Sequence, residues 1–297
     1  MSTNRAFGAA CFAATLAAAV APSRALAQGG TDVWVASFRE TGSRIEVGRP
    51  RNVTDRAGYD NQPSFTPAGD AILFTSIRDD AQADIWRVPI AGGPPVRVTD
   101  TPESEYSATP MPGGAEYSVI RVERDSTQRL WRFPFDGSSP SLVLHALRPV
   151  GYHVWVDAAT LGTFVLGAPN ALVLVDARTE TADTLARDIG RALVRVPGRS
   201  AFTFVQVAGD TNFITEVDAR TRSMRRIAQA PPRADYHLWT PGGQLLSASE
   251  SQLWLWVDHR WDVLIDFAEL GVRGMSRLAI SPRGDHIAFV AQDRAAP

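Results

Sequence analysis

Histidine is the chemically most versatile residue type in this sequence, and one histidine motif occurs twice. The stretches YHVW (residues 152–155) and YHLW (residues 236–239) each place a histidine directly after a tyrosine. Together with carboxylates such as Asp60 and Asp235, two such histidines could ligate a metal ion, because imidazole nitrogen and carboxylate oxygen are common metal ligands. A repeated fold that copies its own packing residues also explains the motif. We favour this second explanation and expect no metal, no cofactor and no catalytic residue.

Signatures of other catalytic sites are missing from the sequence. Cys11 is the only cysteine, and all 30 basic residues are arginine. A cysteine nucleophile in the mature chain and a lysine Schiff base are therefore excluded. The patterns GxSxG, GxGxxG and GxxxxGK[ST] do not occur, which argues against a serine hydrolase elbow and against phosphate-binding loops. The sequence favours a binding protein over an enzyme.

A turn motif recurs along the chain and predicts its architecture. A Pro/Gly turn follows an apolar stretch in FTPAGD, TPMPGGA, VRVPGRS, LWTPGGQ and AISPRGD, and VWVDAAT is a weaker copy. The successive steps of 45, 46, 39, 44 and 41 residues separate the anchors Pro67, Pro112, Ala158, Pro197, Pro241 and Pro282. This period is typical of four-stranded propeller blades, and the runs between the turns are rich in β-branched and aromatic residues, as strands are.

The two ends of the chain carry complementary half-repeats. Residues 275–292 hold only two strands, whereas TDVWVASF (31–38) and PRNVTD (50–55) match the third and fourth strands of the first full repeat. Because closing a ring removes unpaired strand edges, we expect an all-β, six-bladed β-propeller of four-stranded antiparallel blades whose last blade is closed by the mature N-terminus. A β-sandwich is the alternative. The expected blades span about 58–100, 104–146, 148–187, 190–229, 233–270, and 275–292 together with 31–55.

The first 27 residues have the features of a secretory signal peptide. Arg5 precedes an apolar stretch of small residues (6–21), and the sequence ALA before Gln28 is a small-x-small cleavage site. Since the stretch is shorter than the roughly 20 apolar residues that a membrane span needs, we expect cleavage before Gln28 and one domain over residues 28–297. The net charge of −2 argues against a nucleic-acid partner. We expect a periplasmic or secreted monomer without a membrane span.

The first repeat resembles a known family. PSFTPAGDAILFTS (63–76) followed by ADIWRVPIAGGPPVRVT (83–99) is similar to the repeat of TolB-like, WD-repeat-like propellers. The resemblance implies a six-bladed propeller in the periplasm or outside the cell, often with another protein bound at one end of its channel. We expect no counterpart of the N-terminal α/β domain of TolB itself. In the family the matching positions are structural: Pro63, Phe65, Pro67, Gly69, Asp84, Gly92, Gly93 and Thr99.

One end of the expected propeller is richer in residues that bind partners. The loops between second and third strands and those between blades emerge at the same end, whereas the other end has tight Pro/Gly turns. Because arginine and tyrosine are common at interface hot spots, we expect an exported, non-catalytic scaffold that binds a protein or peptide partner at this channel mouth. The alternatives are a metal-dependent lyase or hydrolase acting on a carbohydrate there, or a relic whose partner supplies the activity. The candidate binding residues are Arg78, Asp79, Tyr106, Arg124, Tyr152, His153, Asp235, Tyr236 and His237.

Overall fold

The structure is built almost entirely from antiparallel β-strands. The computed structural model describes residues 30–78 and 82–293, so that the expected signal peptide (1–27) and Asp79 lie outside the described residues. The only helical element within these ranges is the short 3₁₀ turn η1 (Ala268–Leu270). No helix in the described part of the chain is long and apolar enough to cross a membrane. The all-β class expected from the repeats is confirmed.

Four of the sheets contain four strands each, connected in sequence order. The first comprises β8 (Ser104–Pro110), β9 (Glu116–Val122), β10 (Gln128–Pro134) and β11 (Ser141–Leu142). The second comprises β12 (Val150–Trp155), β13 (Thr160–Val165), β14 (Ala171–Asp176) and β15 (Ala182–Arg187). The third comprises β16 (Ile189–Arg195), β17 (Ala201–Ala208), β18 (Thr211–Asp218) and β19 (Met224–Gln229). The fourth comprises β20 (Tyr236–Trp239), β21 (Leu245–Ser249), β22 (Gln252–Val257) and β23 (Arg260–Asp266).

The remaining strands belong to one nine-stranded sheet that joins the two ends of the described chain. Its first part comprises β24 (Ser276–Ile280), β25 (His286–Gln292), β1 (Thr31–Thr41), β2 (Arg44–Val47) and β3 (Arg51–Asn52). Its second part comprises β4 (Tyr59–Phe65), β5 (Ala71–Ile77), β6 (Ala83–Pro89) and β7 (Val96–Arg97). The two parts meet at a single parallel bridge between Thr31 and Tyr59. Within the first part, β1 runs antiparallel to β25 from the pair Thr31–Gln292 to the pair Ser37–His286.

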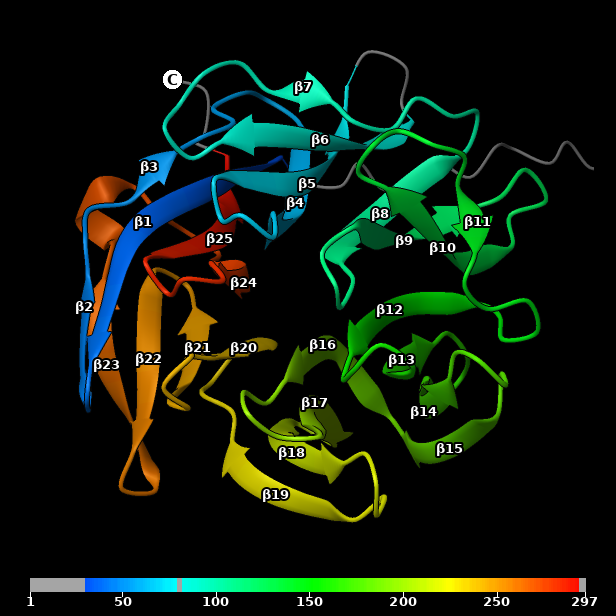
Figure 1. Cartoon of the computed structure of the whole chain (residues 1–297). Coiled ribbons are helices and arrows are strands. Elements are labelled where there is room, and N and C mark those ends of the chain that lie inside the picture. Colours follow the sequence, from blue (N-terminus) through cyan, green and yellow to red (C-terminus); the bar gives the residue numbers. More distant parts are fainter. Residues whose placement is uncertain (1–29, 79–81, 294–297) are drawn as a thin grey trace, which may run out of the picture.

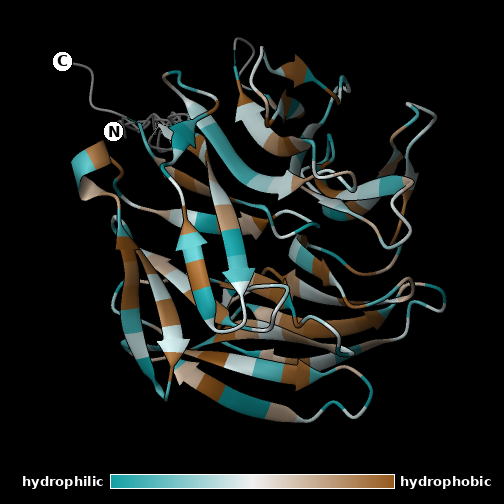
Figure 2. Cartoon of the chain, turned by 60° about the vertical axis from the view of Figure 1, so that its left-hand side comes forward, coloured by the Kyte–Doolittle hydropathy of each residue, from teal (hydrophilic) through white to brown (hydrophobic). Residues whose placement is uncertain are grey.

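The sheets surround a common centre. Figure 1 shows β4, β8, β12, β16, β20 and β24 nearest to this centre, with the later strands of each sheet further out. Hydrophobic and hydrophilic residues alternate along many of the strands (Figure 2), as expected for sheets that pack against neighbours. The arrangement differs from the two facing layers of a β-sandwich, which was the alternative from the sequence.

Hydrophobic clusters fill the space between neighbouring sheets. In one of them, Phe164 and Leu172 of the sheet β12–β15 pack with Phe202 and Phe204 of the sheet β16–β19, and all four side chains are buried. A glycine permits this close approach, because a Cβ atom at Gly162 would lie 2.7 Å from the Phe202 ring. The core is thus distributed between the sheets, and the centre is left to the innermost strands.

Three of the repeated turns share one glycine conformation. Gly69, Gly198 and Gly284 have φ angles of 68°, 68° and 67°, a left-handed conformation that glycine adopts with little cost. Each of these turns joins the innermost strand of its sheet to the second strand. This confirms the turns that the Pro/Gly motif predicts, and it fixes which end of every innermost strand carries a tight turn.

Candidate functional site

The innermost strands carry bulges that set the direction of their side chains. In β4, β8 and β24 the register shifts between Asn61 and Ser64, Tyr106 and Thr109, and Ser276 and Ala279. The bulged residues Gln62, Ser107 and Arg277 have φ angles of 57°, 56° and 53°. A bulge re-aims side chains and ends regular pairing. As a result, these strands direct polar residues toward the centre of the molecule.

A cavity opens at the end opposite the Pro/Gly turns. It measures about 1450 Å³ out to its open end, and we call it the channel mouth. Four tyrosines and two arginines from five sheets line it: Tyr59, Tyr106, Tyr152, Arg191, Tyr236 and Arg277. The amide side chains of Asn61, Gln62, Gln128 and Asn170 complete its polar lining. The channel mouth therefore offers hydroxyl, amide and guanidinium donors.

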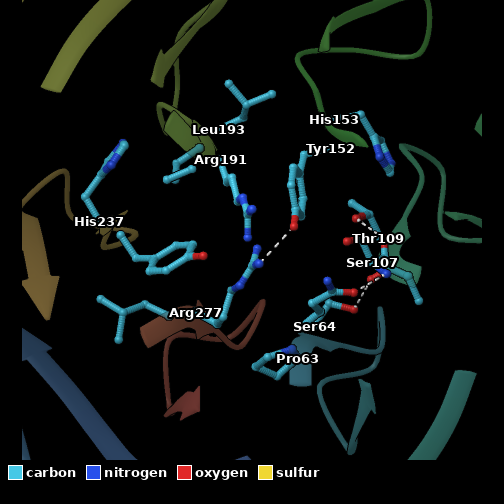
Figure 3. A pocket seen from close by; sticks show the side chains of 16 residues that line it. Pro63, Ser64, Ser107, Thr109, Tyr152, His153, Arg191, Leu193, His237 and Arg277 are labelled. Atoms are coloured by element: carbon cyan, nitrogen blue, oxygen red, sulfur yellow. Dashed lines mark hydrogen bonds between the residues drawn. The ribbon is translucent and has the colours of Figure 1, made fainter. Parts of the chain in front are cut away.

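A second cavity, about 650 Å³ when the space open to solvent is included, continues from the mouth along the same strands. It shares Tyr152, Arg191, Tyr236 and Arg277 with the mouth, and we call it the inner channel. Its further lining is a mixture of hydroxyl and aliphatic side chains, including Ser64, Thr109, Leu193 and Leu278. Figure 3 shows Arg191, Arg277 and Tyr152 pointing into this space from different strands.

Arg277 is held in place by two of the tyrosines. Its guanidinium donates a hydrogen bond of 3.0 Å to the hydroxyl of Tyr152. The guanidinium carbon also lies 4.8 Å from the ring centroid of Tyr152 and 4.6 Å from that of Tyr236, which are cation–π distances. Burial raises the pKa of Tyr59 and of Tyr236, although the charge of Arg277 opposes this. Both hydroxyl groups are therefore protonated at neutral pH and able to donate.

The channel has a positive lining. No Asp or Glu belongs to either cavity in the described part of the chain. Asp235, which lies beside the mouth, accepts a hydrogen bond of 3.2 Å from Asn212 and is exposed. The buried Asp60 of β4 is paired with Arg56 at 3.2 Å instead of with a channel arginine. The site is thus basic although the whole chain has a net charge of −2.

The two repeated histidines join neighbouring sheets. His153 Nε2 lies 2.6 Å from Ser118 Oγ of the preceding sheet, and Trp155 donates to the same oxygen at 2.9 Å. The second copy repeats this geometry, with Thr203 Oγ1 at 2.7 Å from His237 Nε2 and at 2.9 Å from the Trp239 indole nitrogen. Burial lowers the pKa of each histidine to about 3. The motif YHxW is therefore an inter-sheet clamp.

This clamp changes the role expected for His153 and His237. Both line the inner channel, but only 7% and 2% of their surfaces are exposed. Their Nε2 atoms are engaged with hydroxyl groups of the preceding sheet. The structure places both in the wall of the inner channel, whereas the tyrosines of the same motif line the mouth; whether these residues contact a partner stays a prediction.

The remaining candidate residues lie outside the channel. Arg78 stacks over the Trp86 ring at 3.8 Å and donates to Ser76 at 3.0 Å. Arg124 is exposed and lies 3.7 Å from Glu103. Neither belongs to the lining of the mouth or the inner channel. Of the nine candidates, the structure brings Tyr106, Tyr152 and Tyr236 together at the mouth.

Several lining residues were missed by the reasoning from sequence, although the repeat contained the signal. Arg191 stands six residues before its turn residue Pro197, and Tyr106 stands six before Pro112. Arg277 stands five before Pro282, at the bulge. The distance of five or six residues from the turn proline therefore marks both arginines as lining residues. The polar composition of the loops does not mark them.

The described residues contain no cluster of metal-ligating side chains. Within residues 30–78 and 82–293, no group of three or more His, Cys, Asp or Glu side chains is placed to hold a metal ion. The two channel histidines are each occupied at Nε2 by a hydroxyl group.

Comparison with solved structures supports the fold, whereas comparison of sequences assigns no family. No family model matches the chain, and no curated protein sequence matches it. A protein assigned as TolB in Agrobacterium tumefaciens aligns in structure with a TM-score of 0.67 and 16% identity, over 90% of this chain and 99% of that one. A chain of a nidogen/laminin complex gives 0.61 and 11%, over 90% and 100%.

A third solved structure is an oligogalacturonate lyase in complex with manganese. It gives a TM-score of 0.56 and 12% identity, over 82% of this chain and 80% of that one. Identities this low indicate a shared fold only, because one fold hosts many functions. The chain thus has a fold like that of TolB-type β-propellers, and its function has to be argued from its own channel.

Proposed function

We propose that this protein is an exported, non-catalytic β-propeller scaffold that binds a protein or peptide partner at its channel mouth. The observation that carries the proposal is that Tyr106, Tyr152, Tyr236 and Arg277 line the same cavity at one end of the channel. Tyrosine and arginine dominate the binding energy of many interfaces, because they combine large contact area with hydrogen bonding. They are concentrated here at the end where the loops between sheets emerge.

The scaffold itself is proposed to be a closed ring of six blades. In this arrangement β24, β25, β1 and β3 form the sixth blade beside the five that follow one another along the chain. The pairing of β1 with β25, together with the stacking of Trp34 on Phe289 at 6.4 Å, supports it. Closure protects strand edges and gives the loops a rigid frame, which suits a binding surface. Export follows from the signal-like sequence of residues 1–27.

Catalysis is not part of the proposal because, among the described residues, the channel presents no carboxylate and no exposed histidine, which are the most frequent general acids and bases. General acid–base chemistry needs a titratable group close to neutral pH, and the two channel histidines have pKa values of about 3. No carboxylate lines the cavities in the described residues. A metal-dependent lyase or hydrolase acting on a carbohydrate, the alternative from the sequence, finds support only in a shared fold.

Affinity capture tests the proposal with two variants, one altered at the channel mouth and one altered at the opposite end of the molecule. The mature protein carrying a tag is incubated with an envelope fraction, and the captured proteins are identified by mass spectrometry. The double variant Tyr106→Ser, Tyr236→Ser alters the mouth. The double variant Arg178→Ala, Arg220→Ala alters exposed side chains in the turns after β14 and β18, which lie at the other end. Melting temperatures of both variants report on folding.

We expect one partner to be captured by the unaltered protein and by the Arg178/Arg220 variant, and to be lost with the Tyr106/Tyr236 variant. Truncation of a hot-spot residue typically costs about 2 kcal/mol or more, so losing two should lower recovery by well over tenfold. Capture that survives the change at the mouth and disappears with the change at the other end would contradict the proposal.

A further inference from the structure

Two arginines share the channel without an acid to neutralise them. Arg191 on β16 and Arg277 on β24 both line the mouth and the inner channel. Among the described residues, neither makes an ion pair with a carboxylate, whereas arginines elsewhere in the chain, such as Arg56 and Arg121, do. Two like charges in one cavity raise each other's energy, and a bound anion lowers it.

Arg277 is prepared to receive such an anion. A guanidinium has five N–H donors, and that of Arg277 uses one of them, toward Tyr152, within the described part of the chain. Its contact with the rings of Tyr152 and Tyr236 holds the group in one orientation, which reduces the rotamer entropy lost on binding. Figure 3 shows its guanidinium directed into the open channel, as is that of Arg191.

The backbone of Arg277 supports a role beyond packing. Its φ angle of 53° lies in the left-handed region, which costs a residue other than glycine or asparagine free energy. The equivalent bulge positions in β4 and β8 carry Gln62 and Ser107, which are uncharged. Gln62 uses its side-chain oxygen to accept bonds from Ser107 N at 2.8 Å and from Thr75 at 3.0 Å. Arg277 donates one hydrogen bond to Tyr152 within the described residues, which leaves its other N–H donors available for a ligand.

The surroundings indicate which anion fits. A sugar acid bound to Arg277 would stack best on an aromatic face beside the guanidinium, but the rings of Tyr152 and Tyr236, which lie beside it, are contacted by Arg277 itself. An extended peptide instead needs amide partners for its backbone and apolar space for its side chains. The channel mouth offers Asn61 and Asn170, and the inner channel offers Leu193 and Leu278.

We infer that the channel binds a carboxylate carried by an extended peptide segment, with Arg277 as its first contact and Arg191 as its second. The inference rests on the proposed function and specifies the chemistry of the partner: a segment that ends in, or contains, a carboxylate and enters the mouth. A planar guanidinium pairs with a carboxylate through two parallel hydrogen bonds, which would fix the direction of the segment.

Isothermal titration calorimetry on the mature protein at low ionic strength tests this inference. The probes are acetyl-Ala-Leu-Ala-Leu with a free C-terminus, the same peptide with an amidated C-terminus, and amidated acetyl-tetraglutamate. Digalacturonate and inorganic phosphate serve as anions from other sources. The variants are Arg277→Gln and Arg191→Gln, with Arg178→Gln as the matched control, since Arg178 is an exposed arginine outside the channel.

We expect at least one carboxylate-bearing peptide to bind and the amidated neutral peptide not to bind. Arg277→Gln should weaken binding by about 10- to 100-fold, the loss typical of a hydrogen-bonded charge pair. Arg191→Gln should weaken it less, and Arg178→Gln not at all. Because Arg191 is exposed, its variant keeps the fold even if Arg277→Gln lowers the melting temperature. Binding should also fall as salt is added.

Three results would overturn the inference: no binding of any carboxylate peptide at millimolar concentration, equal binding of the amidated neutral peptide, or binding of digalacturonate or phosphate in preference to the peptides. Its failure is distinct from failure of the proposed function. Partner capture that depends on Tyr106 and Tyr236 but is unchanged in Arg277→Gln and Arg191→Gln would leave the scaffold proposal intact and reject the carboxylate.

Discussion

The two inter-sheet clamps predict a specific loss of stability in mild acid. His153 and His237 are buried and neutral in the folded protein, with pKa values lowered by burial from 6.5 to about 3. In the unfolded chain each takes up a proton near its ordinary pKa of about 6.5. The unfolded state therefore binds more protons between pH 6.5 and 3, and acid favours unfolding in this window. The contribution of the two neutral histidines to the free energy of unfolding is complete above pH 6.5 and is lost as the pH falls toward 3.

The size of this effect follows from linkage. At pH 5 protonation lowers the free energy of an unfolded histidine by about 2 kcal/mol, while a folded one with a pKa of 3 gains almost nothing. The two histidines together should lower the free energy of unfolding by about 4 kcal/mol between pH 7 and pH 5. This is a large share of the 5–15 kcal/mol that is typical of a folded domain.

The assay compares urea unfolding at pH 7 and pH 5 for the unaltered protein and for the double variant His153→Gln, His237→Gln. Glutamine does not titrate, and its amide can still bond to Ser118 and Thr203. Other groups titrate alike in both proteins, so the difference isolates the histidines. We expect the unaltered protein to lose about 4 kcal/mol more than the variant between the two pH values. The exposed His259→Gln serves as control. The same pH dependence in both proteins would refute the clamp as described.

Two further predictions concern the scaffold. Gly162→Ala should lower stability by about 1–3 kcal/mol, the usual cost of overpacking a core, because the new Cβ would stand 2.7 Å from the Phe202 ring; a melting temperature unchanged in thermal denaturation would speak against this contact. Deleting residues 31–55 removes β1, β2 and β3 and exposes the edge of β25. Size-exclusion chromatography should then show aggregation, and a monomer with unchanged melting temperature would rule out ring closure by the N-terminal segment.

Much of the architecture was predictable because the repeat is local. Alternating β-branched and aromatic residues predict the strands, and the turn glycines Gly69, Gly198 and Gly284 adopt the left-handed conformation that their motif requires. Strand type and turn type depend on neighbours a few residues away, and the sequence displays those neighbours directly.

The residues of the site were harder to predict from the sequence, because their roles depend on contacts between distant segments. The role of His153 depends on Ser118, which is 35 residues earlier and in another sheet, so that a local motif could not reveal it. The side-chain direction of Arg277 depends on a bulge, which shifts the period of two and defeats a simple alternation argument. Polar composition led to exposed loop residues such as Arg124, whereas the channel is lined by residues at the start of the innermost strands.

Site-specific photo-crosslinking in the producing cell determines whether the channel mouth is the binding face. A photoreactive phenylalanine analogue replaces Tyr106, which lines the mouth, or Arg178, in a turn at the opposite end. We expect a covalent adduct of one defined mass from position 106 and none from position 178. An adduct from position 178 alone would contradict it.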